Sequence, residues 1–256
     1  MTFVPDIQHL HVELTTLCQA ECPMCPRTIL GYHDRRMKNT EIKFKQFKEL
    51  ITPLLPLKRI LFCGTLGDPI ANKDLKVILF WLKQKCPGIN VGINTNGAIG
   101  NTKLWKDIAF LIKDNPYHNV IFSLDGLEDT NHIYRKNVVW KKAMVNAKAY
   151  IAAGGVAHWE MIVFRHNEHQ IDEAKQLAED MGEKLIFVPT EWKTLVNGII
   201  SDKYDISTSA SLSVKRALST GYTNSYFKLA TVPLTLRKNL SKFKGWDDIN
   251  VLGVKV

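Results

Sequence analysis

The chain has 256 residues, of which 45% are hydrophobic and 23% charged, with a formal net charge of +9. This composition excludes a disordered or fibrous protein and suffices for one large α/β domain or two small ones. It contains no run of about 18 apolar residues, so we expect no membrane span. The N-terminus lacks the features of a secretion signal, and three of the five cysteines are clustered. Both observations fit metal chemistry in a reducing cytoplasm better than a disulfide framework, and we expect a cytoplasmic protein.

Strand-like and helix-like patterns alternate from residue 8 to about residue 189. Short runs rich in Ile, Val and Phe predict strands at residues 9–14, 59–63, 90–94, 120–125, 159–164 and 184–188. Apolar residues at spacings of three and four predict helices at residues 41–54, 73–85, 102–113, 138–153 and 168–181. Six such β–α units predict an α/β protein with a parallel sheet and helices outside. The sheet could be open and doubly wound, or curled into a full or partial barrel.

The pattern weakens after residue 190, so we expect a domain at 1–189 and an extension of uncertain structure at 190–256. This extension holds ten Lys and Arg residues against five Asp and Glu residues. A basic segment could meet nucleic acid or an acidic substrate. It contains no dense run of Lys and Arg, which favours a solvated basic surface instead.

Polar and glycine-rich segments follow the predicted strands rather than precede them. Segments 18–25, 64–69, 94–97, 123–126 and 165–167 come after the first five strands in turn. Each segment alone is typical of a turn. Parallel α/β sheets bind their ligands at the carboxyl ends of the strands, so together these segments predict a site there.

The first of these segments carries three cysteines, Cys18, Cys22 and Cys25, in a CxxxCxxC pattern. Three thiolates can hold iron but leave a tetrahedral site one ligand short. Structural zinc sites use four ligands, most often as two spaced pairs, and Cys63 and Cys86 do not form a second pair. A histidine such as His33 could complete a zinc site. A non-catalytic iron–sulfur or zinc-binding module therefore stays an alternative.

This loop resembles the signature of the radical SAM (S-adenosylmethionine) enzymes. In that family three cysteines hold a [4Fe-4S] cluster, whose fourth iron binds the amino and carboxylate groups of S-adenosylmethionine. The resemblance covers about residues 8–189. Segments 13–16, 25–27 and 123–135 are similar to the branch containing the SPASM and twitch enzymes, among them peptide-modifying and sulfatase-maturing enzymes. The fold implied is a partial (β/α)6 TIM-like barrel with a short C-terminal appendage.

The resemblance assigns the turn after the second strand to S-adenosylmethionine. Gly67 and Asp68 look like part of the family's Gly-Glu-Pro turn, whose backbone and acid receive the amino group of the ligand. Asp68 replaces the usual glutamate and reaches one methylene less. Gly64 and Thr65 of the same turn belong to this expected set.

Further binding residues are implied along the same rim. Ser123 falls where the branch binds the ribose hydroxyls, a task that Asn94 or Asn96 could share. Arg135 falls where the branch pairs with the ligand carboxylate, which a guanidinium matches with two parallel N–H groups. The remaining positions concern the adenine: Val163 and Asn167 fall where it is usually held, and Met24 stands where the family often has an aromatic residue.

The chemistry implied is reductive cleavage of S-adenosylmethionine to a 5′-deoxyadenosyl radical, which takes hydrogen from a substrate. We expect a peptide or protein side chain as the substrate, with a small molecule, nucleotide or RNA as the alternative. A reductase or a flavodoxin-like protein would supply the electron. No catalytic residue is assigned beyond the cluster ligands. No cysteine follows Cys86, so we expect none of the auxiliary-cluster cysteines that SPASM and twitch enzymes carry.

Overall fold

The computed structural model describes residues 8–29, 32–33, 37–115, 118–182 and 185–190. The chain divides into two compact units, Met1–Ala210 and Ser211–Val256. All the described residues belong to the first unit. The expected extension at 190–256 lies outside the described residues except for its first residue, so the domain boundary at 189 stays a prediction.

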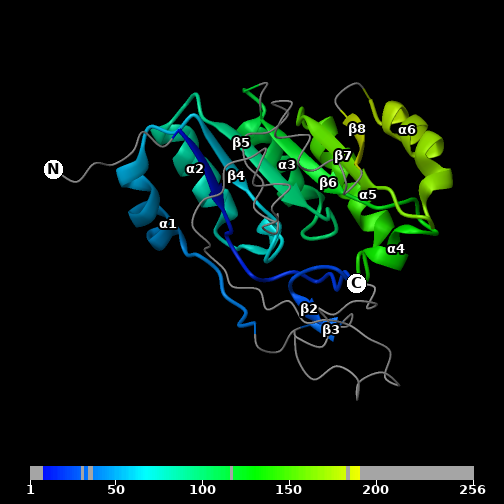
Figure 1. The fold of residues 1–256 in the computed structure, drawn as a ribbon. Helices are drawn as coiled ribbons and strands as arrows, with labels where there is room; N and C mark the ends of the chain where they lie inside the picture. Colours follow the sequence, from blue (N-terminus) through cyan, green and yellow to red (C-terminus); the bar gives the residue numbers. More distant parts are fainter. Residues whose placement is uncertain (1–7, 30–31, 34–36, 116–117, 183–184, 191–256) are drawn as a thin grey trace, which may run out of the picture. The chain divides into compact units, whose positions relative to one another are not determined.

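Six parallel strands form one sheet, and their order in the sheet is their order in the chain. The strands are β1 (His9–Val12), β4 (Arg59–Phe62), β5 (Asn90–Thr95), β6 (Asn119–Ser123), β7 (Ala157–Ile162) and β8 (Leu185–Thr190). Figure 1 shows them side by side, from β1 in dark blue to β8 in yellow. This is the arrangement of the expected partial (β/α)6 barrel, and all six predicted strands are present.

Helices connect consecutive strands. They are α1 (Phe44–Ile51), α2 (Leu75–Lys85), α3 (Thr102–Ile112), α4 (Asn131–Tyr134), α5 (Trp140–Ala152) and α6 (Ile171–Asp180), with 3-10 turns η1 (Thr52–Leu54), η2 (Pro69–Ala71) and η3 (Glu168–Gln170). Neighbouring helices contact one another in the series α1, α2, α3 and α5. These helices therefore form one layer outside the sheet (Figure 1). No helix in the described part of the chain is long and apolar enough to span a membrane.

Two differences from the predicted elements have local causes. The first helix was expected at residues 41–54, but α1 ends at Ile51 and a 3-10 turn follows. Pro53 has no N–H to continue the helix. The two-stranded antiparallel pair of β2 (Thr28–Ile29) and β3 (Tyr32–His33) was not predicted, because two-residue strands are too short to show a period.

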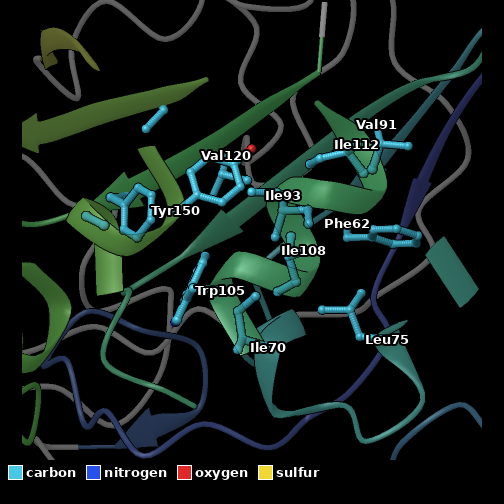
Figure 2. Packing of buried hydrophobic residues seen from close by; sticks show 14 of the residues in the cluster. Phe62, Ile70, Leu75, Val91, Ile93, Trp105, Ile108, Ile112, Val120 and Tyr150 are labelled. Carbon is cyan, nitrogen blue, oxygen red and sulfur yellow. The ribbon is translucent and has the colours of Figure 1, made fainter. Parts of the chain in front are cut away.

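Burial alternates along the strands and separates the two faces of the sheet. Val91, Ile93 and Val120 are at most 2% exposed and pack against the helices. Figure 2 shows side chains of β5 and α3 together in this cluster. Trp105 of α3 lies with its ring centroid 5.0 Å from that of Phe122 and 6.1 Å from that of Tyr150. Large apolar side chains thus fill the layer between sheet and helices.

The opposite face of the sheet mixes polar side chains with apolar ones such as Leu61, Ile121 and Ile162. Among the polar ones, Asn94, Ser123 and Glu160 alternate with buried residues on their strands and are half-buried. Ser123 and Glu160 are direct neighbours in the β6–β7 register. Successive side chains on a strand point to opposite faces, so these residues point away from the helix layer.

Candidate functional site

The cysteine loop follows β1, and hydrogen bonds to its own backbone carbonyls hold its shape. The N–H of Cys25 donates to the carbonyl of Cys22 at 3.0 Å. The hydroxyl of Thr28 donates to the same carbonyl at 2.6 Å and lies 2.9 Å from the carbonyl of Cys25. These bonds set the second and third cysteines on one tight turn.

Arg27 braces the start of the loop from within. Its side chain is 2% exposed. Its Nε donates to the carbonyl of Thr16 at 3.0 Å, and its Nη1 donates to the carbonyl of Ala20 at 3.3 Å. A guanidinium has five donors and can bind several backbone carbonyls at once, which suits an irregular loop.

All three thiols of the loop are free, and Cys22 is buried while Cys18 and Cys25 are half-buried. Burial raises the pKa of Cys18 to about 11. Burial also raises the pKa of Cys22, against the opposing effect of the Arg135 guanidinium. Within the described residues, no three His, Cys, Asp or Glu side chains form a group that could hold a metal ion. The three cysteine ligands of a [4Fe-4S] cluster each bind a different iron, so they do not have to gather around a single ion.

The turn after β4 lies directly against the chain that enters the cysteine loop. The N–H of Asp68 donates to the carbonyl of Leu17 at 2.8 Å. A Cβ at Gly67 would lie 2.2 Å from the carbonyl oxygen of Thr15, so no side chain fits there. Gly64 makes a similar close approach, with its Cβ position 3.1 Å from the carbonyl oxygen of Asn94. The glycines of this turn therefore serve backbone contact between loops.

Glu13 fixes the backbone of the same turn. Its two carboxylate oxygens accept from the N–H groups of Thr65 and Leu66, each at 3.1 Å. The N–H of Thr65 is thus already paired within the protein. Glu13 lies one residue after β1 and joins the first loop of the rim to the second.

Asp68 is 3% exposed and receives all its hydrogen bonds from the protein. Its Oδ1 accepts from the N–H of Ile70 at 3.0 Å, and its Oδ2 accepts from the N–H of Asn96 at 2.8 Å. The hydroxyl of Thr95 lies within 3.0 Å of both oxygens. Burial raises the pKa of Asp68, and the hydrogen bonds from Asn96, Ile70 and Thr95 oppose that rise.

Asn96 joins Asp68 to the cysteine loop. Its Nδ2 lies 2.7 Å from Oδ2 of Asp68 and 3.5 Å from Sγ of Cys18. Its Oδ1 accepts from Nε2 of Gln19 at 2.7 Å. The structure therefore brings the loops after β1, β4 and β5 together, as their positions at the strand ends predicted.

Arg135 and Asp125 form a second polar centre beside the cysteine loop. Nε of Arg135 lies 2.5 Å from Oδ2 of Asp125, whose side chain is fully buried. The other carboxylate oxygen of Asp125 accepts from the N–H of Ile162 at 2.7 Å. The positive charge of the Arg135 guanidinium also lowers the pKa of Cys22, although burial has the larger, opposite effect. Arg135, which is expected to bind the ligand carboxylate, therefore already uses its Nε–H within the protein.

Asn167 is fully buried and shapes the loop after β7. Its Nδ2 donates to the carbonyls of Asp125 and Ile162, both at 2.9 Å, and its Oδ1 accepts from the N–H of Phe164 at 2.7 Å. Val163 lies between these partners and is half-buried. Asn167 thus sets the backbone course where the adenine is expected.

Three expected contact residues remain open to a ligand. Ser123 and Asn94 lie on the sheet face that points away from the helices. Oδ1 of Asn94 is buried and has no hydrogen-bond partner in the described part of the protein. Met24 is 73% exposed on the cysteine loop.

Sequence reasoning assigned no role to four residues that hold this site together. They are Glu13, Gln19, Arg27 and Asp125. Glu13, Arg27 and Asp125 stand in the very segments that carry the family resemblance. A charged residue within an otherwise apolar or turn segment was the available signal, because a buried charge needs partners.

A family model, that of the radical SAM superfamily, matches residues 12–178. The chain belongs to this superfamily. Radical SAM proteins hold a [4Fe-4S] cluster and S-adenosylmethionine, as the loop signature had implied. The matched segment contains the three cysteines and every rim residue described above.

Solved radical SAM structures share the fold. SuiB of Streptococcus suis bound to S-adenosylmethionine is 16% identical, with a TM-score of 0.56, over 73% of this chain and 41% of that one. The structure of anSMEcpe with bound AdoMet is 17% identical, with a TM-score of 0.54, over 72% of this chain and 50% of that one. The chain thus spans half or less of the length of these structures.

A curated relative matches a shorter stretch. The cyclohexadienyl dehydratase of Pseudomonas aeruginosa is 32% identical over 85 residues, which are 33% of this chain and 32% of that protein. A stretch of this size carries no activity from one protein to the other.

The residues present fit the two groups that radical SAM proteins hold. Three free thiols share one short loop, and cysteine thiolates are the ligands that hold iron–sulfur clusters. The unpaired buried oxygen of Asn94 suits a ligand with hydroxyl groups. Cys18, Cys22 and Cys25 would hold the cluster, and the surrounding rim would hold the nucleoside.

Proposed function

We propose that this protein is a radical SAM enzyme that takes a hydrogen atom from a peptide or protein side chain. The observation that carries the proposal is the cysteine loop at the carboxyl end of β1, packed against the loops that follow β4, β5 and β6. When bound, the cluster and S-adenosylmethionine would supply reductive C–S cleavage and a 5′-deoxyadenosyl radical. An electron from a reductase or a flavodoxin-like protein would start this chemistry.

The chain's own residues would bind and orient the ligand. Arg135 would meet the ligand carboxylate with the N–H groups that Asp125 leaves available. Asn94 and Ser123 would accept and donate hydrogen bonds at the ribose hydroxyls. Asn167 would position the backbone around Val163 against the adenine, beside the exposed thioether of Met24.

A peptide substrate is supported by what two similar structures hold. SuiB was solved with the precursor peptide SuiA, and its likeness has a TM-score of 0.55 at 16% identity. The structure of anSMEcpe with AdoMet and the Cp18Cys peptide has a TM-score of 0.52 at 16% identity. Both share the sheet and the helix layer described here, and the sheet face that points away from the helices would lie toward such a substrate.

Anaerobic reconstitution tests the cofactor chemistry. The wild-type protein should bind a [4Fe-4S] cluster and, once reduced with dithionite, form 5′-deoxyadenosine from S-adenosylmethionine. Cys25→Ala should lose both, because a cluster ligand is removed. Cys86→Ala is the matched control, since Cys86 is a buried cysteine that ends α2, away from the rim. Bound zinc in place of iron, or an iron-loaded and reduced protein that forms no 5′-deoxyadenosine, would contradict the proposal.

Deuterium transfer tests the substrate class. The reduced enzyme is incubated with S-adenosylmethionine and either a side-chain-deuterated peptide library or deuterated RNA. Mass spectrometry of the 5′-deoxyadenosine should show deuterium after incubation with the peptides. Deuterium that appears in the 5′-deoxyadenosine only after incubation with RNA would contradict a peptide substrate and indicate a nucleic acid instead.

A further inference from the structure

The amide of Asn96 has a fixed orientation toward the cysteine loop. Its Oδ1 accepts from Nε2 of Gln19 at 2.7 Å and from the N–H of Ala98 at 3.0 Å. Two donors on one atom identify that atom as the oxygen, so the nitrogen faces the other way. That nitrogen lies 2.7 Å from Oδ2 of Asp68 and 3.5 Å from Sγ of Cys18.

The two hydrogens of this amide have two different acceptors. One points to the buried carboxylate of Asp68, which also accepts from the Asn96 backbone N–H at 2.8 Å. The other lies between Sγ of Cys18 and Oε1 of Gln19, which is 3.3 Å from Nδ2. Asn96 is 5% exposed, so water does not compete for these groups.

This arrangement leaves Asn96 no group for a ribose hydroxyl. Its oxygen and both N–H groups are engaged within the protein, whereas the oxygen of Asn94 has no partner in the described part of the chain. Either Asn94 or Asn96 was expected to bind the ribose hydroxyls. The geometry favours Asn94 for that task, whereas Asn96 contacts the sulfur of Cys18.

We propose that Asn96 is a positioning residue that donates an N–H···S hydrogen bond to the Cys18 cluster ligand, with Asp68 holding the amide in place. Hydrogen bonds to the sulfurs of an iron–sulfur cluster are one of the factors that determine its reduction potential. A donor stabilises the reduced form, which carries the extra negative charge, and so makes the potential less negative. This inference rests on the proposed cluster at Cys18, Cys22 and Cys25.

The test is the midpoint potential of the reconstituted cluster, measured by a redox titration followed by EPR. Asn96→Leu keeps the volume of the side chain and removes the donor without opening a path for water. Its cluster should have a more negative midpoint than the wild-type cluster at equal iron and sulfide content.

Asn146→Leu is the matched control. Asn146 is also buried and holds the same loop, with Nδ2 2.8 Å from the carbonyl of Gly97 and 3.3 Å from that of Ile99. Its amide donates to these backbone carbonyls and not to a sulfur, so its loss should lower the melting temperature and leave the midpoint unchanged. An Asn96→Leu cluster with the wild-type midpoint, or an equal shift in both variants, would overturn the inference.

A measurement on the wild-type holoprotein decides the matter even where Asn96→Leu fails to retain iron. The protein is labelled with ¹⁵N at asparagine side-chain amides alone, and the reduced cluster is examined by pulsed EPR. We expect a ¹⁵N coupling that marks an amide bound to the cluster. A loaded cluster without this coupling refutes the role of Asn96 alone, whereas a chain that binds no iron at all refutes the proposed function.

Discussion

The two ends of the sheet use polar side chains in different ways. At the amino end, side chains bind the backbone where strands begin: Nδ1 of His118 accepts from the N–H of Val91 at 2.8 Å, and Nδ2 of Asn115 donates to the carbonyl of Ile89 at 3.1 Å. At the carboxyl end, side chains also bind backbone groups, but some of them bind side chains from other loops as well, as Asp68 binds Asn96.

This difference shows where the molecule is built for stability and where it is built for chemistry. Backbone partners at the amino end satisfy the strand starts, at the opposite end of the sheet from the cysteine loop. At the carboxyl end, the amide of Asn96 connects the buried carboxylate of Asp68 to the thiol of Cys18. Variants at the amino end should therefore change stability alone, and variants at the carboxyl end should change stability and cofactor binding together.

The largest expected effect follows from Asp125→Ala. The change removes the carboxylate that pairs with the mostly buried Arg135 guanidinium. It also removes the acceptor of the Ile162 N–H. Breaking a buried ion pair on one side costs about 3–5 kcal/mol. Urea unfolding of the purified protein should show a loss of this size, together with weaker retention of iron.

Glu128→Ala is the control for this prediction. Glu128 pairs with Lys141 at 2.8 Å, and both side chains are exposed. Exposed pairs contribute little, so the midpoint of unfolding should not change measurably. Equal losses in the two variants would show that Asp125 is not the anchor described here.

A smaller effect is expected for Gly67→Ala. The new Cβ would meet the carbonyl oxygen of Thr15 at 2.2 Å, so the turn must move away from the cysteine loop. Forced overpacking costs about 1–3 kcal/mol, and bound iron should fall because the loop shifts. Calorimetry and iron counting measure the two effects.

Gly88→Ala is the matched control at the amino end. No atom lies within 4 Å of a Cβ at Gly88. This variant should retain its iron and stay within about 1 kcal/mol of the wild type. A loss of iron in Gly88→Ala would remove the contrast between the two ends.

The smallest effect concerns pH and His118. Burial lowers the pKa of His118 in the folded protein below its ordinary value of 6.5, and its Nδ1 must stay unprotonated to accept from Val91. The unfolded chain thus binds the proton first, so stability is complete above pH 6.5 and falls as the pH drops below it. His118→Gln should remove this part of the pH dependence in urea unfolding between pH 7.5 and 5.5. A slope identical to that of the wild type would contradict this role.

The alternation of β and α patterns was enough to predict the sheet, because six short apolar runs with turn residues after them have few other solutions. It did not predict β2, β3 or α4, each shorter than the periods that sequence reasoning detects. For the site, the family motifs identified the cysteine loop and the rim. Family motifs name which residues gather, but hydrogen-bond partners depend on packing between loops.

Asp68 and Asn96 show this limit most clearly. The family resemblance assigned Asp68 to the amino group of S-adenosylmethionine and Asn94 or Asn96 to the ribose, and the structure places Asp68 and Asn96 together at the rim. The sequence could not show that the Asp68 carboxylate accepts hydrogen bonds from Thr95 and Asn96, because these contacts depend on how the turn after β4 packs against the end of β5. The family's Glu is one methylene longer than Asp. This difference matters here because Asp68 is only 3% exposed.

The unpartnered oxygen of Asn94 has a thermodynamic consequence for the protein without its ligand. A buried acceptor without a donor costs about 1–3 kcal/mol, so this strand end is less stable than an apolar residue would make it. A nucleoside hydroxyl would remove that cost on binding, which couples occupancy of the site to the stability of β5. The folded state would then report the presence of its own ligand through a rise in melting temperature.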